Sequence, residues 1–173
     1  MNQQIPVWID GRLQPMDKIA VHAQGLRHPA VSVFVVAGDR LLIQRRALGK
    51  YHTPGLWANT CCTHPLWAED PAVCAARRLF EELGLSDLAL EHRGVVEYRA
   101  AVGAGMIEHE VVDLFLARCD TPPTVVENPE EVMDHRWITA ADLHREIEQR
   151  PEAFTPWLRI YLHEHGAQVL PGF

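Results

Sequence analysis

The segment from Asp70 to Gly84 constrains the fold more than any other, because it carries the signals for both ends of one helix. Asp70 is a good N-cap, Pro71 suits the first helical position, and Gly84 suits the residue after the last turn. The apolar residues between these ends recur at helical spacing. We expect these side chains to face a core: Val73, Ala76, Phe80 and Leu83.

Strand signals lie on both sides of this helix. Ala30–Ala37 and Leu41–Gln44 are apolar runs separated by a Gly-Asp turn, which predicts a hairpin. Further strands are expected over 56–64, 94–99 and 108–118, and further helices from Thr139 and from Thr155. This order predicts an α/β or α+β fold with a mixed central sheet, in a single domain spanning 1–173.

The charge balance excludes some classes of partner. Lysine and arginine number 16 against 23 aspartates and glutamates, which gives a net charge of −7. No basic cluster stands out, so we expect no nucleic-acid partner. We expect no membrane span or secretory signal, because no apolar run approaches the roughly 18 residues that cross a bilayer. Four cysteines, two of them adjacent, favour a reducing cytoplasm over a disulfide framework, and we expect a monomer or weak dimer.

Two arginines and two glutamates repeat at four-residue spacing on the helix, Arg77 with Glu81 and Arg78 with Glu82. Alone, such pairs indicate a solvated face and contribute little to stability. Glu69, however, precedes Arg77 with seven residues between them. This spacing makes the segment resemble the Nudix box.

The Nudix box reads Gly, five residues, Glu, seven residues, then Arg-Glu-aliphatic-any-Glu-Glu-any-Gly-aliphatic. The matching positions are Glu69, Arg77, Leu79, Glu81, Glu82, Gly84 and Leu85. Thr63 stands at the position of the first Gly, and Arg78 replaces the Glu that follows the arginine. In hydrolysing members the box glutamates gather a divalent cation that activates water against a diphosphate. A guanidinium there favours holding a diphosphate intact, so the resemblance implies a Nudix-like α/β/α sandwich without ordinary hydrolysis.

Two further segments place reactive side chains two residues apart. If 60–64 is extended, Cys62 and His64 point to one side and Cys61 to the other. Glu108 and Glu110 likewise share one face of a strand, where they repel each other unless a cation or a proton compensates. Taken alone, a buried cysteine that acts as a small hydrophobe and an exposed strand face explain these segments as well.

Taken together, NTCCTHP at 59–65, the pair Glu108 and Glu110, and FTPW at 154–157 resemble the type I isopentenyl-diphosphate isomerase family. The resemblance runs in order over about 18–162. It implies an enzyme of isoprenoid biosynthesis that interconverts isopentenyl diphosphate and dimethylallyl diphosphate through a carbocation-like intermediate. Such chemistry needs an acid and a base on opposite sides of a flat allylic unit, with no water to trap the cation.

The resemblance also implies roles for individual residues. Cys62 and Glu110 take the places of the acid and the base, and Tyr98 hydrogen-bonds near that glutamate. Trp157 presents an indole face, which attracts a cation. Mg²⁺ is expected to bridge the substrate diphosphate near Glu82. The basic residues expected to bind the diphosphate are Lys18, Arg46, Lys50 and Arg78.

A separate divalent cation is implied as well. The residues that match its ligands are His22, His28, His64, Glu108 and Glu110. Mixed imidazole and carboxylate donors suit Mn²⁺, Zn²⁺ or Mg²⁺, and six-coordination is most natural for Mn²⁺ or Mg²⁺. Without the resemblance, His22 and His28 are lone residues in a segment that reads as loop-rich. The other seven of the 10 histidines, His52 among them, receive no role.

The sequence leaves two other functions open. A Nudix pyrophosphohydrolase acting on a nucleoside diphosphate derivative would release phosphate or nucleotide with Mg²⁺, and Arg78→Glu would improve it. A non-catalytic, metal-stabilised binding module would keep its full function in Cys62→Ala.

Overall fold

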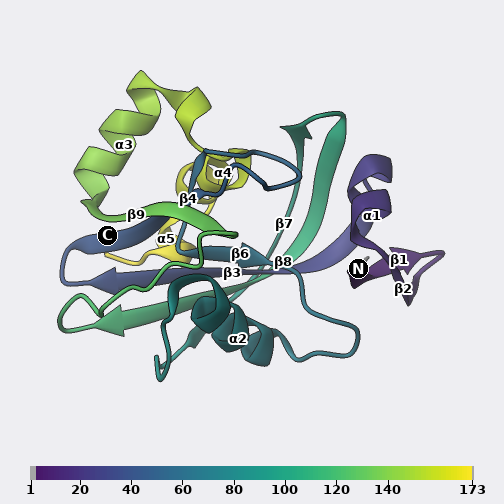
Figure 1. The fold of residues 1–173 in the computed structure, drawn as a ribbon, viewed down its shortest axis with the longest axis horizontal. Coiled ribbons are helices and arrows are strands. Elements are labelled where there is room, and N and C mark those ends of the chain that lie inside the picture. The colour runs from purple at the N-terminus through teal and green to yellow at the C-terminus, as the bar shows by residue number, and fades with distance from the viewer. Residues whose placement is uncertain (1–2, 173) are drawn as a thin grey trace.

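The computed structural model describes residues 3–172, and a mixed seven-stranded sheet lies at its centre (Figure 1). The strands of this sheet are β3 (Arg27–Ala37), β4 (Arg40–Arg46), β5 (Trp57–Ala58), β6 (Cys61–Thr63), β7 (Glu91–Gly103), β8 (Met106–Cys119) and β9 (Val132–Thr139). Their order is β5-β4-β3-β8-β7, with β6 paired to β3 and β9 paired to β4. β3 and β8 run parallel, whereas β7 and β8 are antiparallel. A separate hairpin joins β1 (Gln4–Ile9) to β2 (Arg12–Asp17).

Helices cover both faces of the sheet. They are α1 (Lys18–Gln24), α2 (Pro71–Leu83), α3 (Ala140–Gln149), the 3₁₀ turn η1 (Pro151–Ala153), α4 (Pro156–Glu164) and α5 (Gly166–Val169). Figure 1 shows α2 on one face and α3 and α4 on the other. The predicted sandwich of helices around a mixed central sheet is confirmed (Figure 1). In the described part of the chain, no helix combines the length and apolarity needed to cross a bilayer.

Alternate side chains of β3 belong to two different apolar cores. Val31 and Val33 pack with Leu79 and Leu83 of α2 on one face. Phe34, at the next position, packs with the helices of the other face. Successive side chains of a strand point to opposite faces, so one apolar strand serves both layers.

The predicted hairpin of β3 and β4 and the helices that begin after Thr139 and Thr155 are confirmed. Several elements lack counterparts in the predictions, β9 and α1 among them. The prediction of a loop-rich segment around His22 and His28 is wrong, because His22 lies on α1 and His28 on β3. With 7 residues, α1 is too short to produce a periodic apolar pattern.

The ends of α2 are as predicted, but its buried face is not. Asp70 accepts hydrogen bonds from the Ala72 and Val73 amides, and Gly84 has a φ of 66°. Val73 is 58% exposed and Phe80 is 61% exposed, and Ala76 is exposed as well. The buried residues are Cys74, Ala75, Leu79, Glu82 and Leu83. The helix has two apolar faces, one with Val73 and Phe80 and one with Cys74 and Leu79. The second face packs against the sheet, and this orientation also buries Glu82.

This orientation of α2 predicts very different costs for neighbouring truncations. Leu79→Ala should lower the free energy of unfolding by about 2–5 kcal/mol, because it leaves a cavity against the sheet. Phe80→Ala should change it by no more than about 0.5 kcal/mol, since the ring is mostly in solvent. Urea denaturation measures both values. A Phe80→Ala cost equal to that of Leu79→Ala would mean that the helix is rotated the other way.

Candidate active site and metal centre

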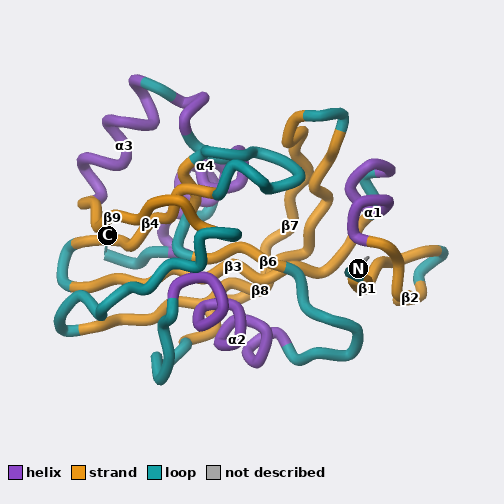
Figure 2. The backbone as a smooth tube through the Cα atoms, in the orientation of Figure 1, coloured by secondary structure: helices purple, strands orange, loops and turns teal. Residues whose placement is uncertain are grey.

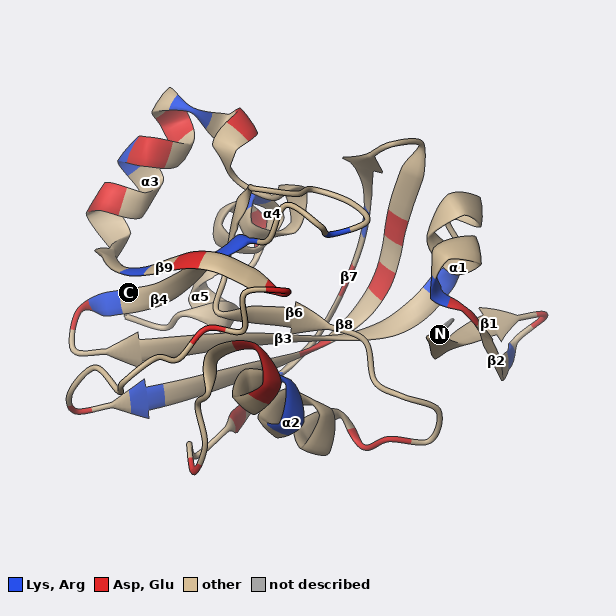
Figure 3. Ribbon diagram, viewed as in Figure 1, with Lys and Arg blue, Asp and Glu red and all other residues tan. Residues whose placement is uncertain are grey.

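Strand register brings three site residues together. The parallel pairing of β3 and β8 sets His28 beside Glu110, and the antiparallel pairing of β7 and β8 sets Tyr98 beside Glu110. Glu108 lies two residues before Glu110 on β8, so the two side chains are on the same face of the strand. Figure 3 shows the acidic positions along β8. Both glutamates are buried, which removes the exposed-strand explanation of this pair.

Tyr98 links the two carboxylates. Its hydroxyl oxygen lies 2.7 Å from Glu108 Oε2 and 2.7 Å from Glu110 Oε2. A phenol has one proton to donate, so the second contact requires a proton on one of the carboxyls. Burial and the neighbouring charge of Glu110 raise the pKa of Glu108 well above its usual range. Burial also disfavours the charge of Glu110, but the imidazoles of His28 and His64 hold its pKa well below the usual range.

Two of the predicted histidine ligands have their tautomers fixed by the backbone. His22 Nδ1 lies 2.7 Å from the Lys18 carbonyl oxygen, and His28 Nδ1 lies 2.7 Å from the Leu26 carbonyl oxygen. A carbonyl only accepts, so each Nδ1 carries the hydrogen and each neutral ring presents a lone pair at Nε2. Burial, aided by His28, lowers the pKa of His22 to about 4. The neutral ring is the form that binds a metal.

These lone pairs converge on a single point of the site. Donor atoms of His22, His28, His64 and Glu110 all lie within 4.8 Å of one another. His64 Nε2 is 3.0 Å from Glu110 Oε1 and 3.2 Å from His28 Nε2. His64 Nδ1 is buried without a hydrogen-bond partner. Converging imidazole and carboxylate donors fit a divalent cation, and the residues present therefore suit a metal.

The segment that carries His22 has a small apolar core of its own. Val21 of α1 packs with Ile5 and Val7 of β1 in a cluster apart from the two main cores. So small a cluster stabilises the segment weakly, and an ion bound to His22 and His28 would tie it to the sheet.

Removal of the ion is therefore expected to loosen residues 15–30. A chelator should increase proteolytic cleavage there and leave α2 protected, as read by mass spectrometry of the fragments. His22→Ala should show the same cleavage with or without chelator. Equal cleavage of the wild type with and without chelator would contradict the stabilisation of residues 15–30 by a bound ion.

Cys62 lies on β6, opposite Ser32 of β3, and has polar neighbours. Its thiol donates to Asn59 Oδ1 at 2.9 Å, and Ser32 Oγ lies 2.9 Å from the sulfur. Burial raises the pKa of Cys62 well above its ordinary value, so the group is a thiol at neutral pH. Cys61 faces the opposite side of β6 and is fully buried in the core shared with α2. The predicted alternation of these cysteines is confirmed.

One cavity is lined by the catalytic candidates and by four basic residues. These basic residues are Lys18, Arg46, Lys50 and Arg78. Burial, followed by the positive charges of Lys50, Arg78 and Arg46, lowers the pKa of Lys18 to about 8. Such mutual repulsion is relieved by an anion. Glu131 occupies part of this cluster, because it pairs with Lys50 and lies 3.1 Å from Arg78.

Glu82 is held by protein donors. Arg78 Nη2 donates to Glu82 Oε1 at 2.6 Å, and Gln44 Nε2 donates to Glu82 Oε2 at 2.9 Å. Its carboxylate is outside the two groups of side chains that lie close enough to share a cation.

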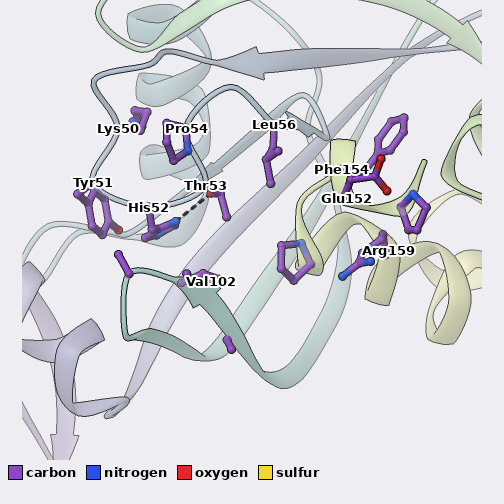
Figure 4. A pocket seen from close by; sticks show the side chains of 15 residues that line it. Lys50, Tyr51, His52, Thr53, Pro54, Leu56, Val102, Glu152, Phe154 and Arg159 are labelled. Atoms are coloured by element: carbon purple, nitrogen blue, oxygen red, sulfur yellow. Dashed lines mark hydrogen bonds between the residues drawn. The ribbon is translucent and has the colours of Figure 1, made fainter.

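The cavity at the centre of the site is small. It measures about 20 Å³, and Cys62, Glu110 and Trp157 are among the residues that line it. That volume admits about one water molecule. A neighbouring pocket of about 490 Å³ shares Lys50, Tyr51 and His52 with it (Figure 4). Lys50, Tyr51 and His52 belong to the connection between β4 and β5, which Figure 2 draws as a loop, and this loop therefore lines both cavities.

Three residues of this site escaped the sequence analysis: Tyr51, His52 and Glu131. The Tyr51 hydroxyl lies 3.3 Å from His22 Nε2, and His52 Nε2 lies 3.3 Å from Glu108 Oε1. The available signal was position, because Tyr51 and His52 directly follow Lys50. No such signal marks Glu131, which reaches the site from the start of β9.

Comparison with known proteins places this fold and site. Residues 26–158 match the NUDIX domain, so the chain is a NUDIX protein. Curated proteins named isopentenyl-diphosphate Delta-isomerase match nearly its whole length. One from Cereibacter sphaeroides is 59% identical over 98% of this chain and 96% of its own, and one from Ruegeria pomeroyi is 61% identical over 95% and 92%. The chain belongs to the isopentenyl-diphosphate Delta-isomerase family.

Solved structures agree on the fold. A Deinococcus radiodurans protein aligns with a TM-score of 0.70 at 16% identity, covering 88% of this chain and 93% of its own. A MutT NUDIX hydrolase from Burkholderia pseudomallei aligns with a TM-score of 0.63 at 21% identity, covering 80% and 98%. At these identities the likeness concerns the fold alone.

Proposed function

We propose that this protein interconverts isopentenyl diphosphate and dimethylallyl diphosphate. The observation that carries the proposal is the cavity in which Cys62, Glu110 and Trp157 meet below a cluster of basic side chains. The names of its close relatives support the same activity.

The chemistry moves one proton onto the substrate and another off it. Addition of a proton to the terminal CH₂ carbon of isopentenyl diphosphate leaves a tertiary cation, and loss of a proton from the neighbouring CH₂ forms the new double bond. Cys62 and Glu110 are the proposed acid and base, with the resting proton on the Cys62 thiol. The reverse reaction exchanges their roles. Tyr98 holds Glu110 in place, and the Trp157 ring faces the cation.

A cavity of this small size serves this chemistry by leaving little room for water, which would trap the cation. Because the cavity is far smaller than the substrate, the loop around Tyr51 and His52 must move for entry. The proposed contacts of the diphosphate are Lys18, Arg46, Lys50 and Arg78, and Glu82 would hold a Mg²⁺ ion that offsets the negative charge of the diphosphate.

The proposed ligands of the second ion are His22, His28, His64, Glu108 and Glu110, and Mn²⁺ is the preferred candidate. A bound divalent ion supplies positive charge that keeps the glutamates ionised and fixed. The chain's own residues carry every proton.

Incubation with isopentenyl diphosphate in deuterated water tests the proposal. Deuterium should enter a methyl group of dimethylallyl diphosphate and, through the reverse reaction, the CH₂ next to the branched carbon of isopentenyl diphosphate, as followed by NMR. Failure to incorporate deuterium with Mn²⁺ and Mg²⁺ present would reject it. Release of phosphate or of a nucleoside monophosphate in place of exchange would favour hydrolysis, which the Arg78 pairing with Glu82 argues against.

We further propose that residues 1–173 act as one domain, as a monomer or weak dimer in the cytoplasm. The four free cysteines support a reducing compartment.

A further inference from the structure

His52 lies inside the metal centre although it has no part in the ligand set above. Its side chain is 3% exposed, and its ring centroid is 5.4 Å from that of His22. Donor atoms of His52, His22 and Glu108 lie within 4.8 Å of one another. The site therefore contains a second group of potential ligands that overlaps the first at His22.

The two glutamates are arranged alike around Tyr98. The Tyr98 hydroxyl contacts Oε2 of both carboxylates, so Oε1 of each is turned toward an imidazole. Glu110 Oε1 is 3.0 Å from His64 Nε2, and Glu108 Oε1 is 3.3 Å from His52 Nε2. His52 Nε2 thus lies close to Glu108 Oε1, just as His64 Nε2 lies close to Glu110 Oε1.

The shared residue indicates one ion with two overlapping groups of ligands. His22 Nδ1 is committed to the Lys18 carbonyl, which leaves Nε2 as its only donor atom. One nitrogen lone pair binds one ion. Through His22 the two groups can therefore share only one cation between them.

We propose that His52 is a fourth imidazole ligand of this cation. The complete set of donors is His22, His28, His52, His64, Glu108 and Glu110. The proposal deepens the proposed function and rests on its metal centre. Four nitrogen and two oxygen donors favour a transition-metal ion over Mg²⁺. Six protein donors also leave no position for a metal-bound water, which suits an enzyme that does not hydrolyse its diphosphate.

Ligation through His52 would couple the ion to the substrate side of the site. Arg46 Nη2 donates to the His52 carbonyl oxygen at 3.1 Å, and the His52 and Trp157 rings meet edge to face at 5.9 Å. The loop that carries His52 lines both the central cavity and the larger pocket. The Tyr51 hydroxyl lies 3.3 Å from His22 Nε2, and it must release that nitrogen when an ion binds there.

Mn²⁺ binding tests the assignment without relying on turnover. Paramagnetic resonance of free Mn²⁺ gives affinity and stoichiometry for the wild type, His52→Ala and His52→Gln. The matched control is His109→Gln, since His109 lies between the two glutamates on β8 but contacts Glu97 on the outer face. The wild type should bind one Mn²⁺, both His52 variants should bind it at least about 10- to 100-fold more weakly, and the control should be unchanged.

Glutamine separates a metal ligand from a polar neighbour of Glu108, because its amide can lie against Glu108 Oε1 but supplies no imidazole nitrogen. Wild-type Mn²⁺ affinity in His52→Gln would overturn the proposal, as would two ions per wild-type chain. X-ray absorption of the Mn²⁺-loaded wild type should count four imidazoles, and this measurement needs no variant to fold. A count of three would also overturn the proposal. Absence of deuterium exchange with this count intact would reject the proposed function alone.

Discussion

Replacement of Cys62 by alanine is expected to remove isomerisation while leaving the fold intact. Loss of a positioned proton donor lowers the rate by about 10²- to 10⁴-fold. No other thiol can substitute, since Cys61 faces the opposite core and Cys74 is buried on α2. Deuterium exchange into isopentenyl diphosphate measures the loss. Mn²⁺ affinity should be unchanged, because Cys62 lies outside both groups of potential ligands.

Cys61→Ala is the matched control. It removes a sulfur one residue away, but on the face that packs against α2. It should lower the stability and preserve the rate of exchange per folded molecule. Full deuterium exchange in Cys62→Ala would contradict the role of Cys62 as the proton donor. It would favour the interpretation of the chain as a binding module.

Local signals predicted the boundaries of elements well and their orientation less well. Asp70 and Gly84 mark the ends of α2 through cap chemistry that depends only on neighbouring residues. Which stripe of α2 is buried depends on the sheet, where Gln44 of β4 provides a partner for Glu82. The helical spacing of Val73 and Phe80 could not reveal that partner.

In the candidate site, too, the sequence predicted features that depend on neighbouring residues and missed those that depend on tertiary contacts. Strand alternation placed Glu108 and Glu110 on one face, and the structure agrees. The shared proton, by contrast, depends on the register between β7 and β8, which sets Tyr98 beside Glu110. His52 reaches the candidate metal site through a loop whose path depends on contacts across the fold, including the hydrogen bond from Arg46 to its carbonyl. Neither feature has a local sequence signal.

Glu110→Gln should have the other large effect, because Glu110 serves both the ion and the proton transfer in the proposed mechanism. An amide can neither take up a proton at neutral pH nor replace a carboxylate ligand. Exchange should fall by about 10²- to 10⁴-fold, and Mn²⁺ affinity should fall at least about 10- to 100-fold.

Glu108→Gln provides the contrast, and the stability of the ion-free proteins distinguishes the two sites. The folded-state pKa of Glu110 is depressed, so its carboxylate stabilises the fold above the unfolded pKa of about 4.3, and this stabilisation is lost as pH falls through the folded pKa. Glu110→Gln should therefore lower stability at pH 7 and flatten its decline in acid. Glu108 holds its proton in the ion-free fold, since its pKa is raised, so Glu108→Gln mimics the native state there and should cost little at pH 7.

Urea denaturation in chelator across pH 3–8 measures this difference. Equal losses at pH 7 for both variants would contradict the assignment of the shared proton to Glu108. If Glu110→Gln lost Mn²⁺ but kept full exchange when Mn²⁺ was restored at high concentration, Glu110 would be a ligand only. The second proton-transfer group would then have to be sought at Glu108 or Tyr98, the two side chains that share its hydrogen bonds.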